Sequence, residues 1–128
     1  MSNPGTLALA IGGVALFGGT GSILRLLLSS WVGKIPLGIL AGNTVASAVV
    51  GFLYPLSASQ NGIWGVWSLL LATGFAGGLS TFSSWAAQTA QLMGSGNRKL
   101  ALLNFGLNMF LPVIAALGGM ILALLLLK

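Results

Sequence analysis

The residues best suited to handle an ion lie in one short stretch, GFAGGLSTFSSW at residues 74–85. It combines three glycines with four hydroxyl residues, in the middle of an apolar run from residue 64 to residue 93. As one continuous helix, that run would be about 45 Å long at 1.5 Å per residue. This is well beyond a hydrocarbon core of roughly 30 Å, so the run is too long for a simple straight span.

Glycine is a poor residue for a helix interior, which makes this stretch a candidate helix break. Broken backbone at membrane depth is tolerated only where protein buries it or where it lines a polar path, because lipid offers no hydrogen-bond partner. We therefore predict a break near Gly77 that presents backbone groups to an ion. The alternative is a straight helix whose small residues permit close packing.

The composition excludes most of the chemistry that enzymes use. The 128 residues contain no Asp, Glu, His or Cys, so carboxylate acid–base catalysis, His or Cys nucleophiles and the usual metal-ligand sets are absent. Apolar residues make up 56% of the chain and charged residues 4%. So few charges cannot cover the surface of a soluble domain, which predicts an integral membrane protein that is not an enzyme.

Four apolar segments are each long enough to cross a bilayer, which predicts an all-α membrane protein. The predicted spans are residues 7–28, 37–56, 64–93 and 100–127. Because the connections between them are short, residues 1–128 are expected to form a single four-helix transmembrane domain.

The cations lie near the predicted helix ends and are interpreted as topology signals. They are Arg25, Lys34, Arg98, Lys99 and Lys128. Their scatter argues against a nucleic-acid-binding patch. The positive-inside rule places the first and third connections in the cytoplasm, but a margin of a few charges is compatible with insertion in either orientation.

Polar side chains inside the spans are further candidates for function. The amide of Asn43 has two N–H donors, which suits an anion, although interhelical hydrogen bonding is an equal alternative. Asn104 and Asn108 are four residues apart and face the same way, and interhelical hydrogen bonding is the favoured interpretation for them. Arg25 is expected to reach the interface or to bond helix carbonyls; the alternative is that it draws anions into a vestibule.

Two further patterns bear on an ion pathway. Phe82 and Trp85 share one helix face, and their electropositive ring edges are able to contact a dehydrated anion, although aromatic stripes are usually core packing.

Four helices are few for an ion pathway, which favours a dimer. The small residues Gly38, Gly42 and Ala46 form a stripe suited to close helix contact, with packing inside one chain as an equal alternative.

Taken together, these motifs resemble the Fluc family of fluoride channels, also called CrcB, over all four segments in order. The third-segment match, TGFAGGLSTFS at residues 73–83, is the specific one. The supporting matches are GGTGSILR at 18–25, IPLG at 35–38 with Asn43, and ALLN at 101–104 with Asn108.

The resemblance implies an antiparallel, dual-topology dimer in the inner (plasma) membrane that exports cytoplasmic fluoride by passive flow through two pores. It implies a structural Na⁺ at the dimer centre, held by the backbone carbonyls of Gly77 and Ser80. Arg25 would line a vestibule. The implied pore residues are Asn43, Phe82, Ser83, Ser84 and Trp85.

This chain departs from the family pattern at several polar positions. The family usually has Phe in place of Trp85, Thr in place of Ile39 and Ser80, Glu in place of Gln88, and hydroxyl residues in place of Pro112 and Ala116. Losses at four of these positions (Ile39, Gln88, Pro112 and Ala116) suggest relaxed demand on part of the lining. We therefore keep two hypotheses for the partner: a second copy of this chain, which is the default, or a homologous subunit of opposite orientation.

Two other functions remain as alternatives. A small multidrug-type exporter subunit also has four short helices, but it needs a membrane carboxylate, and this chain has none. A structural membrane subunit without transport is the other alternative, and a flux measurement separates it from a channel.

Overall fold

The computed structural model describes residues 4–59 and 63–128, whose regular secondary structure is helical throughout. The first, second and fourth spans are α1 (Pro4–Ser29), α2 (Leu37–Ser59) and α6 (Arg98–Leu126). The third span consists of α3 (Ile63–Ser68), the π-helical segment η1 (Leu69–Ala76), α4 (Gly77–Leu79) and α5 (Phe82–Gly94).

Four stretches of the described chain are long and apolar enough to cross a membrane. They are Leu7–Ser29, Leu37–Ser57, Gly65–Gly94 and Arg98–Leu126. They confirm the predicted number of spans and the all-α class, and they make the chain a multi-pass membrane protein.

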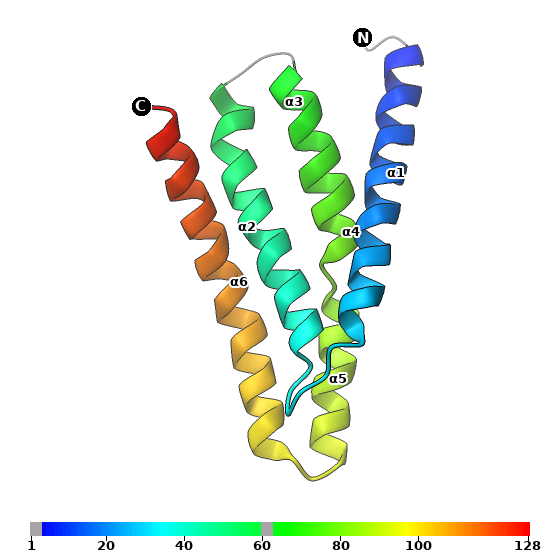
Figure 1. The fold of residues 1–128 in the computed structure, drawn as a ribbon, viewed down its shortest axis with the longest axis vertical. Helices are drawn as coiled ribbons and strands as arrows, with labels where there is room; N and C mark the ends of the chain where they lie inside the picture. Colours follow the sequence, from blue (N-terminus) through cyan, green and yellow to red (C-terminus); the bar gives the residue numbers. More distant parts are fainter. Residues whose placement is uncertain (1–3, 60–62) are drawn as a thin grey trace.

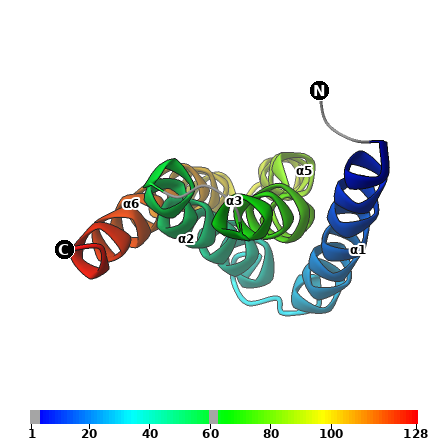
Figure 2. The ribbon, with the colours of Figure 1, turned by 90° about the horizontal axis from the view of Figure 1, so that it is seen from above.

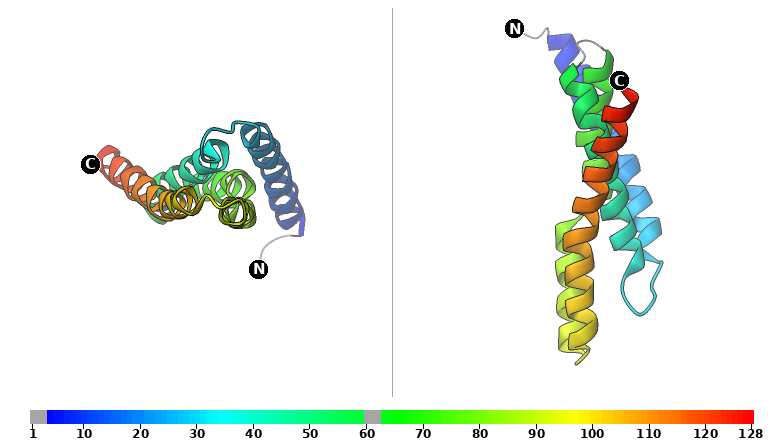
Figure 3. Two further views of the ribbon diagram at one scale, coloured as in Figure 1. Left: turned by 90° about the horizontal axis from the view of Figure 1, so that it is seen from below. Right: turned by 90° about the vertical axis from the view of Figure 1, so that its left-hand side faces the viewer.

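The spans stand side by side in a curved row (Figures 1 and 2). The order across the row is α6, α2, the third span and α1 (Figure 1). The long helix α6 changes neighbour along its length, packing against α5 in its first half and against α2 in its second half (Figure 3). The connections after α1 and after α5 lie at the same end of the helices, the lower end in Figure 1. Lys34 belongs to the first connection, and Arg98 and Lys99 begin α6 directly after the second, so these three cations lie toward that end.

Glycines bring α1 into backbone contact with the first half of the third span. A Cβ on Gly78 would collide with the carbonyl of Gly18, and a Cβ on Gly21 would collide with the carbonyl of Phe75. Such contacts replace side-chain packing by direct van der Waals contact between helix backbones. They fix α4 against α1 immediately before the chain leaves the helix.

The small-residue stripe of α2 also packs inside the chain. A Cβ on Gly38 would collide with the carbonyl of Leu28, and Gly42 lies against Leu79. Ala46 is 1% exposed and belongs to the buried cluster with Ala76 and Leu79. This stripe is therefore used within one chain and provides no argument for a second copy.

The third span is interrupted near Gly77, as predicted, and the break itself lies at Ser80 and Thr81. Gly77 has helical backbone angles (φ −63°, ψ −38°) and belongs to α4. The chain becomes extended at Ser80 (ψ 151°) and Thr81 (ψ 124°), and α5 begins at Phe82. The break follows Gly77 by three residues, because Gly74 and Gly78 serve close packing against α1 and two hydroxyl residues take the extended conformation.

Candidate functional site

Thr81 ends the interruption by capping α5. Its Oγ1 accepts a hydrogen bond from the Ser84 N–H at 3.3 Å, one of the orphan donors of the first helical turn. The hydroxyls of Ser83 and Ser84 lie 3.2 and 3.3 Å from the same Oγ1. These three hydroxyls therefore form a local cluster at the start of α5.

Asn43 of α2 bridges the interruption from the side. Its Oδ1 accepts from the Thr81 N–H at 2.8 Å, and its Nδ2 donates to the Thr81 carbonyl at 3.3 Å. In an unbroken helix, the Thr81 N–H would bond the Gly77 carbonyl. Asn43 thus takes the place of that helix bond and leaves the Gly77 carbonyl without its usual donor.

The carbonyls before the interruption meet side chains from α1. Arg25 Nη1 donates to the Ser80 carbonyl at 3.5 Å, and Ser22 Oγ donates to the Gly78 carbonyl at 3.4 Å. Arg25 thus bonds a backbone carbonyl at the break, which lies just outside the helix. Its implied role in a vestibule stays a prediction.

A cavity of about 210 Å³, here called the break cavity, opens beside the interruption. It is lined by Asn43, Ser47, Ser80, Thr81, Phe82, Trp85, Asn108 and Pro112. The structure thus brings together three of the five predicted pore residues, Asn43, Phe82 and Trp85. The predicted Ser83 and Ser84 are not among the lining residues and bond Thr81 instead.

The aromatic wall of the break cavity has defined ring geometry. Phe82 and Trp85 meet edge to face, with centroids 5.1 Å apart and planes at 84°. Trp85 also packs on Phe105 at 5.2 Å. The Trp85 Nε1–H is buried and has no hydrogen-bond partner among residues 4–59 and 63–128, and the buried Gln88 Oε1 lacks one there as well.

A second cavity of about 210 Å³, the carbonyl cavity, is lined by Gly77 and Ser80 together with small residues of α2, η1 and α6. The Gly77 carbonyl has lost its helix donor to Asn43. The Ser80 carbonyl has also lost its usual donor, because the Ser84 N–H bonds Thr81 Oγ1. Carbonyl oxygens that have lost their helix donors suit a cation, so Gly77 and Ser80 fit the implied Na⁺ as oxygen ligands. The Ser80 carbonyl also accepts the long bond from Arg25, at 3.5 Å.

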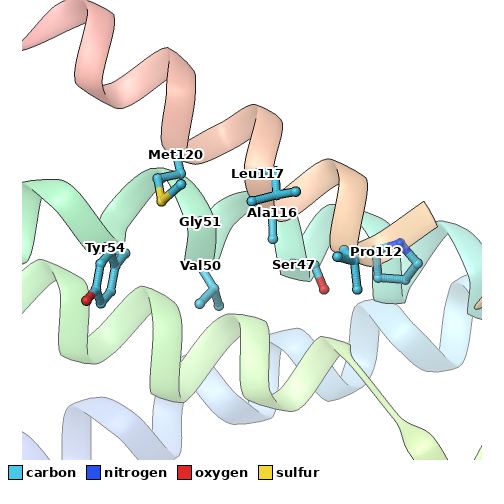
Figure 4. Close-up of a pocket in the computed structure, with 9 residues that line it drawn as sticks. Ser47, Val50, Gly51, Tyr54, Pro112, Ala116, Leu117 and Met120 are labelled. Atoms are coloured by element: carbon cyan, nitrogen blue, oxygen red, sulfur yellow. The ribbon is translucent and has the colours of Figure 1, made fainter. Parts of the chain in front are cut away.

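A third cavity, the apolar groove, runs between α2 and α6 and has a volume of about 350 Å³ (Figure 4). It includes Pro112 and Ala116, where the family pattern has hydroxyls, and Ser47 lies beside them (Figure 4). Ser47 lines all three cavities. Ile39, by contrast, is 3% exposed and lies outside all three.

Ser47 and Thr81 belong to the site but were not predicted from the sequence. Ser47 follows Asn43 by one helical turn, so the spacing of the two residues was a usable signal for a shared face. Thr81 had no such signal, because its role depends on the extended backbone that only the structure reveals. The contact of Asn108 with Asn43, at 3.1 Å, was equally invisible in the sequence.

Comparison with known proteins gives the same family as the motifs. Residues 13–120 match the family described as "CrcB-like protein, Camphor Resistance (CrcB)". The chain is 39% identical over 100 residues to proteins named "Fluoride-specific ion channel FluC" from Escherichia coli O17:K52:H18 (strain UMN026 / ExPEC) and O139:H28 (strain E24377A / ETEC). Each alignment covers 75% of this chain and 79% of the relative. The extent of both matches establishes that the chain belongs to the CrcB family.

Proposed function

We propose that this chain is a subunit of a fluoride-selective channel through which cytoplasmic fluoride leaves the cell by passive flow. The observation that carries the proposal is the break cavity, where Asn43, Phe82 and Trp85 meet in a chain without any carboxylate. The names of its relatives support the same ion. An anion needs donors and positive edges, and this cavity offers both.

Fluoride is small and strongly hydrated, so its dehydration must be compensated by short, well-placed contacts. The Asn43 amide and the Ser47 hydroxyl supply hydrogen-bond donors, while Phe82 and Trp85 supply electropositive ring edges. The break cavity also lies at the N-terminus of α5, where the helix dipole favours negative charge. Chloride is larger and is expected to fit this arrangement poorly.

The proposed assembly is an antiparallel, dual-topology dimer in the plasma membrane. Phe82 is 73% exposed in the single chain, so a second subunit is needed to close the pore around it. The cations lie mainly toward one end of the helices, yet their number is small enough for insertion in either orientation. A Na⁺ held by Gly77 and Ser80 carbonyls of both chains would tie the two breaks together.

The partner is either a second copy of this chain or a homologous subunit. The apolar groove supports the second possibility, because Pro112 and Ala116 place no hydroxyl where the family has one. Two different chains could preserve one pore while the other loses its polar lining. A homodimer remains the default.

The deciding experiment is anion efflux from liposomes that contain the purified chain, with fluoride compared against chloride in matched vesicles. We expect fluoride efflux and little chloride efflux. No efflux of either ion would support a structural subunit, and proton-coupled efflux of organic cations would support an exporter. Repeating the assay with a homologue from the same genome separates a homodimer from a heterodimer.

A further inference from the structure

Five hydrogen bonds join the break to α5 through α2 and α6, and we call this chain of bonds the amide relay. The Thr81 N–H donates to Asn43, Asn43 to Asn108, Asn108 to Asn104, Asn104 to Thr89, and Thr89 to the Trp85 carbonyl. Their lengths in that order are 2.8, 3.1, 3.2, 2.8 and 2.9 Å. Every member donates onward to the next, so the relay has a single direction.

Backbone groups at both ends fix that direction. A backbone N–H only donates, so the Asn43 oxygen must face Thr81 and its NH₂ group must face Asn108. At the far end the Trp85 carbonyl only accepts, so Thr89 must donate to it and accept from Asn104. The two ends impose the same orientation on the amides between them.

Two members of the relay are buried. Asn104 is 0% exposed and Asn108 is 7% exposed. A flipped amide at either position would set donor against donor, and a buried polar group without a partner is costly in a membrane protein. Hydrogen bonding between helices would need only one such link, whereas this relay continues to Asn43 in the break cavity.

Both N–H groups of Asn43 are occupied in this arrangement. One donates to Asn108 Oδ1 at 3.1 Å and the other to the Thr81 carbonyl at 3.3 Å. An anion can receive a hydrogen bond from Asn43 only by replacing one of them. The bond to Thr81 is the longer, and Asn108 Oδ1 is held in place by the rest of the relay.

We propose that Asn108, Asn104 and Thr89 are positioning residues, which hold the amide plane of Asn43 so that its second N–H points to a place where the transported fluoride replaces the Thr81 carbonyl as acceptor. This inference rests on the proposed fluoride channel function. Asn108 lines the break cavity, but Asn104 and Thr89 act only through their neighbours. Asn108 Nδ2 also donates to the Asn104 backbone carbonyl at 3.1 Å, and Asn43 keeps its bond from the Thr81 N–H. Loss of a link is therefore expected to loosen the acceptor of one Asn43 N–H, and so to weaken the bond of the other N–H to the ion, without releasing the amide.

A matched pair of threonine variants tests the relay. Thr89→Val removes the Thr89 hydroxyl, which is the last side-chain acceptor of the relay, and keeps the branched shape of the side chain. Thr44→Val removes a hydroxyl adjacent to Asn43 that donates to the Leu40 carbonyl, outside the relay. We expect the fluoride concentration for half-maximal efflux to rise roughly threefold in Thr89→Val, to stay unchanged in Thr44→Val, and to return in Thr89→Ser.

Asn108→Leu removes the link next to Asn43, and a rise of roughly tenfold is expected there. If Asn108→Leu does not fold, the comparison of Thr89→Val with Thr44→Val still tests the inference. A fall in maximal rate with unchanged half-saturation in Thr89→Val would indicate a purely structural role and overturn the inference, as would equal shifts in the two valine variants. A wild-type chain that passes no fluoride, alone or with its homologue, would instead overturn the proposed function and, with it, this role of the relay.

Discussion

The two halves of the third span are held by different kinds of contact. Before the break, η1 and α4 touch α1 through glycine backbones at Gly74 and Gly78, with few polar side chains involved. After the break, α5 is joined to α6 by the Asn104–Thr89 hydrogen bond and by stacking of Trp85 on Phe105. The first half is thus positioned by packing and the second by polar and aromatic contacts.

Because of this difference, we expect the first half to determine stability and the second half to determine how the ion is bound. In a membrane, close backbone packing is a main source of helix association, so the first half is expected to determine whether the break forms. Buried polar groups at membrane depth are expensive and usually functional, so the second half is expected to determine which ion passes. Variants in the two halves should therefore fail in different assays.

The largest effect is expected for Asn43→Ala, which removes the amide shared by the break and the relay. Loss of a hydrogen bond to a charged group costs about 1.5–3 kcal/mol, so fluoride occupancy should fall roughly tenfold or more. Liposome efflux normalised to folded protein measures this. Asn97→Ala, which removes an exposed amide before α6, is the control, and unchanged efflux in Asn43→Ala would remove Asn43 from the pore.

Gly78→Ala should affect stability instead of selectivity. Its methyl group would collide with Gly18, and overpacking of this kind costs about 1–3 kcal/mol. We expect a lower thermal unfolding temperature in detergent, with fluoride-over-chloride selectivity retained in the protein that folds. Gly19→Ala is the control, since its Cβ would meet no atom of the chain within 4 Å. Equal melting of the two variants would contradict glycine packing as the basis of the first half.

Trp85→Phe is expected to have a smaller effect that is confined to transport. The ring edge remains, but the unpaired indole N–H is lost. Because this N–H is buried in the single chain, the loss is expected to be smaller than the about 1.5–3 kcal/mol of a full hydrogen bond to a charged group. Half-saturation should rise a few-fold while the melting temperature stays the same, because no intrachain bond is broken. Efflux equal to wild type would show that the indole N–H does not meet the ion.

Arg25→Gln should have the smallest effect. Its bond to the Ser80 carbonyl is long, at 3.5 Å, so its loss is expected to lower the free energy of unfolding by at most about 1 kcal/mol. Chemical denaturation in mixed micelles measures this, with Lys34→Gln in the connection after α1 as the control. A collapse of fluoride efflux without loss of stability would favour the vestibule role of Arg25.

The sequence by itself determined the class of protein and the kind of coordination available. Its apolar stretches are long enough to span a bilayer. Because acids, His and Cys are absent, the groups left to meet an ion are amides, hydroxyls, aromatic rings, backbone groups and a few Lys and Arg side chains. The resemblance in the second and third segments then singled out Asn43, Phe82 and Trp85, which the structure places in one cavity. Each of these conclusions depends on residue type and local spacing alone.

Only the tertiary structure decided where the break lies and what holds it. Glycine in a sequence signals either a break or a close contact, and the neighbouring backbone of α1 makes Gly78 a contact, which moves the break to Ser80 and Thr81. The bonds from Asn43 to Thr81 and Asn108 join residues 38 and 65 positions apart. No local pattern encodes such pairs, because they arise when α2, α5 and α6 pack together and their buried amides must find partners.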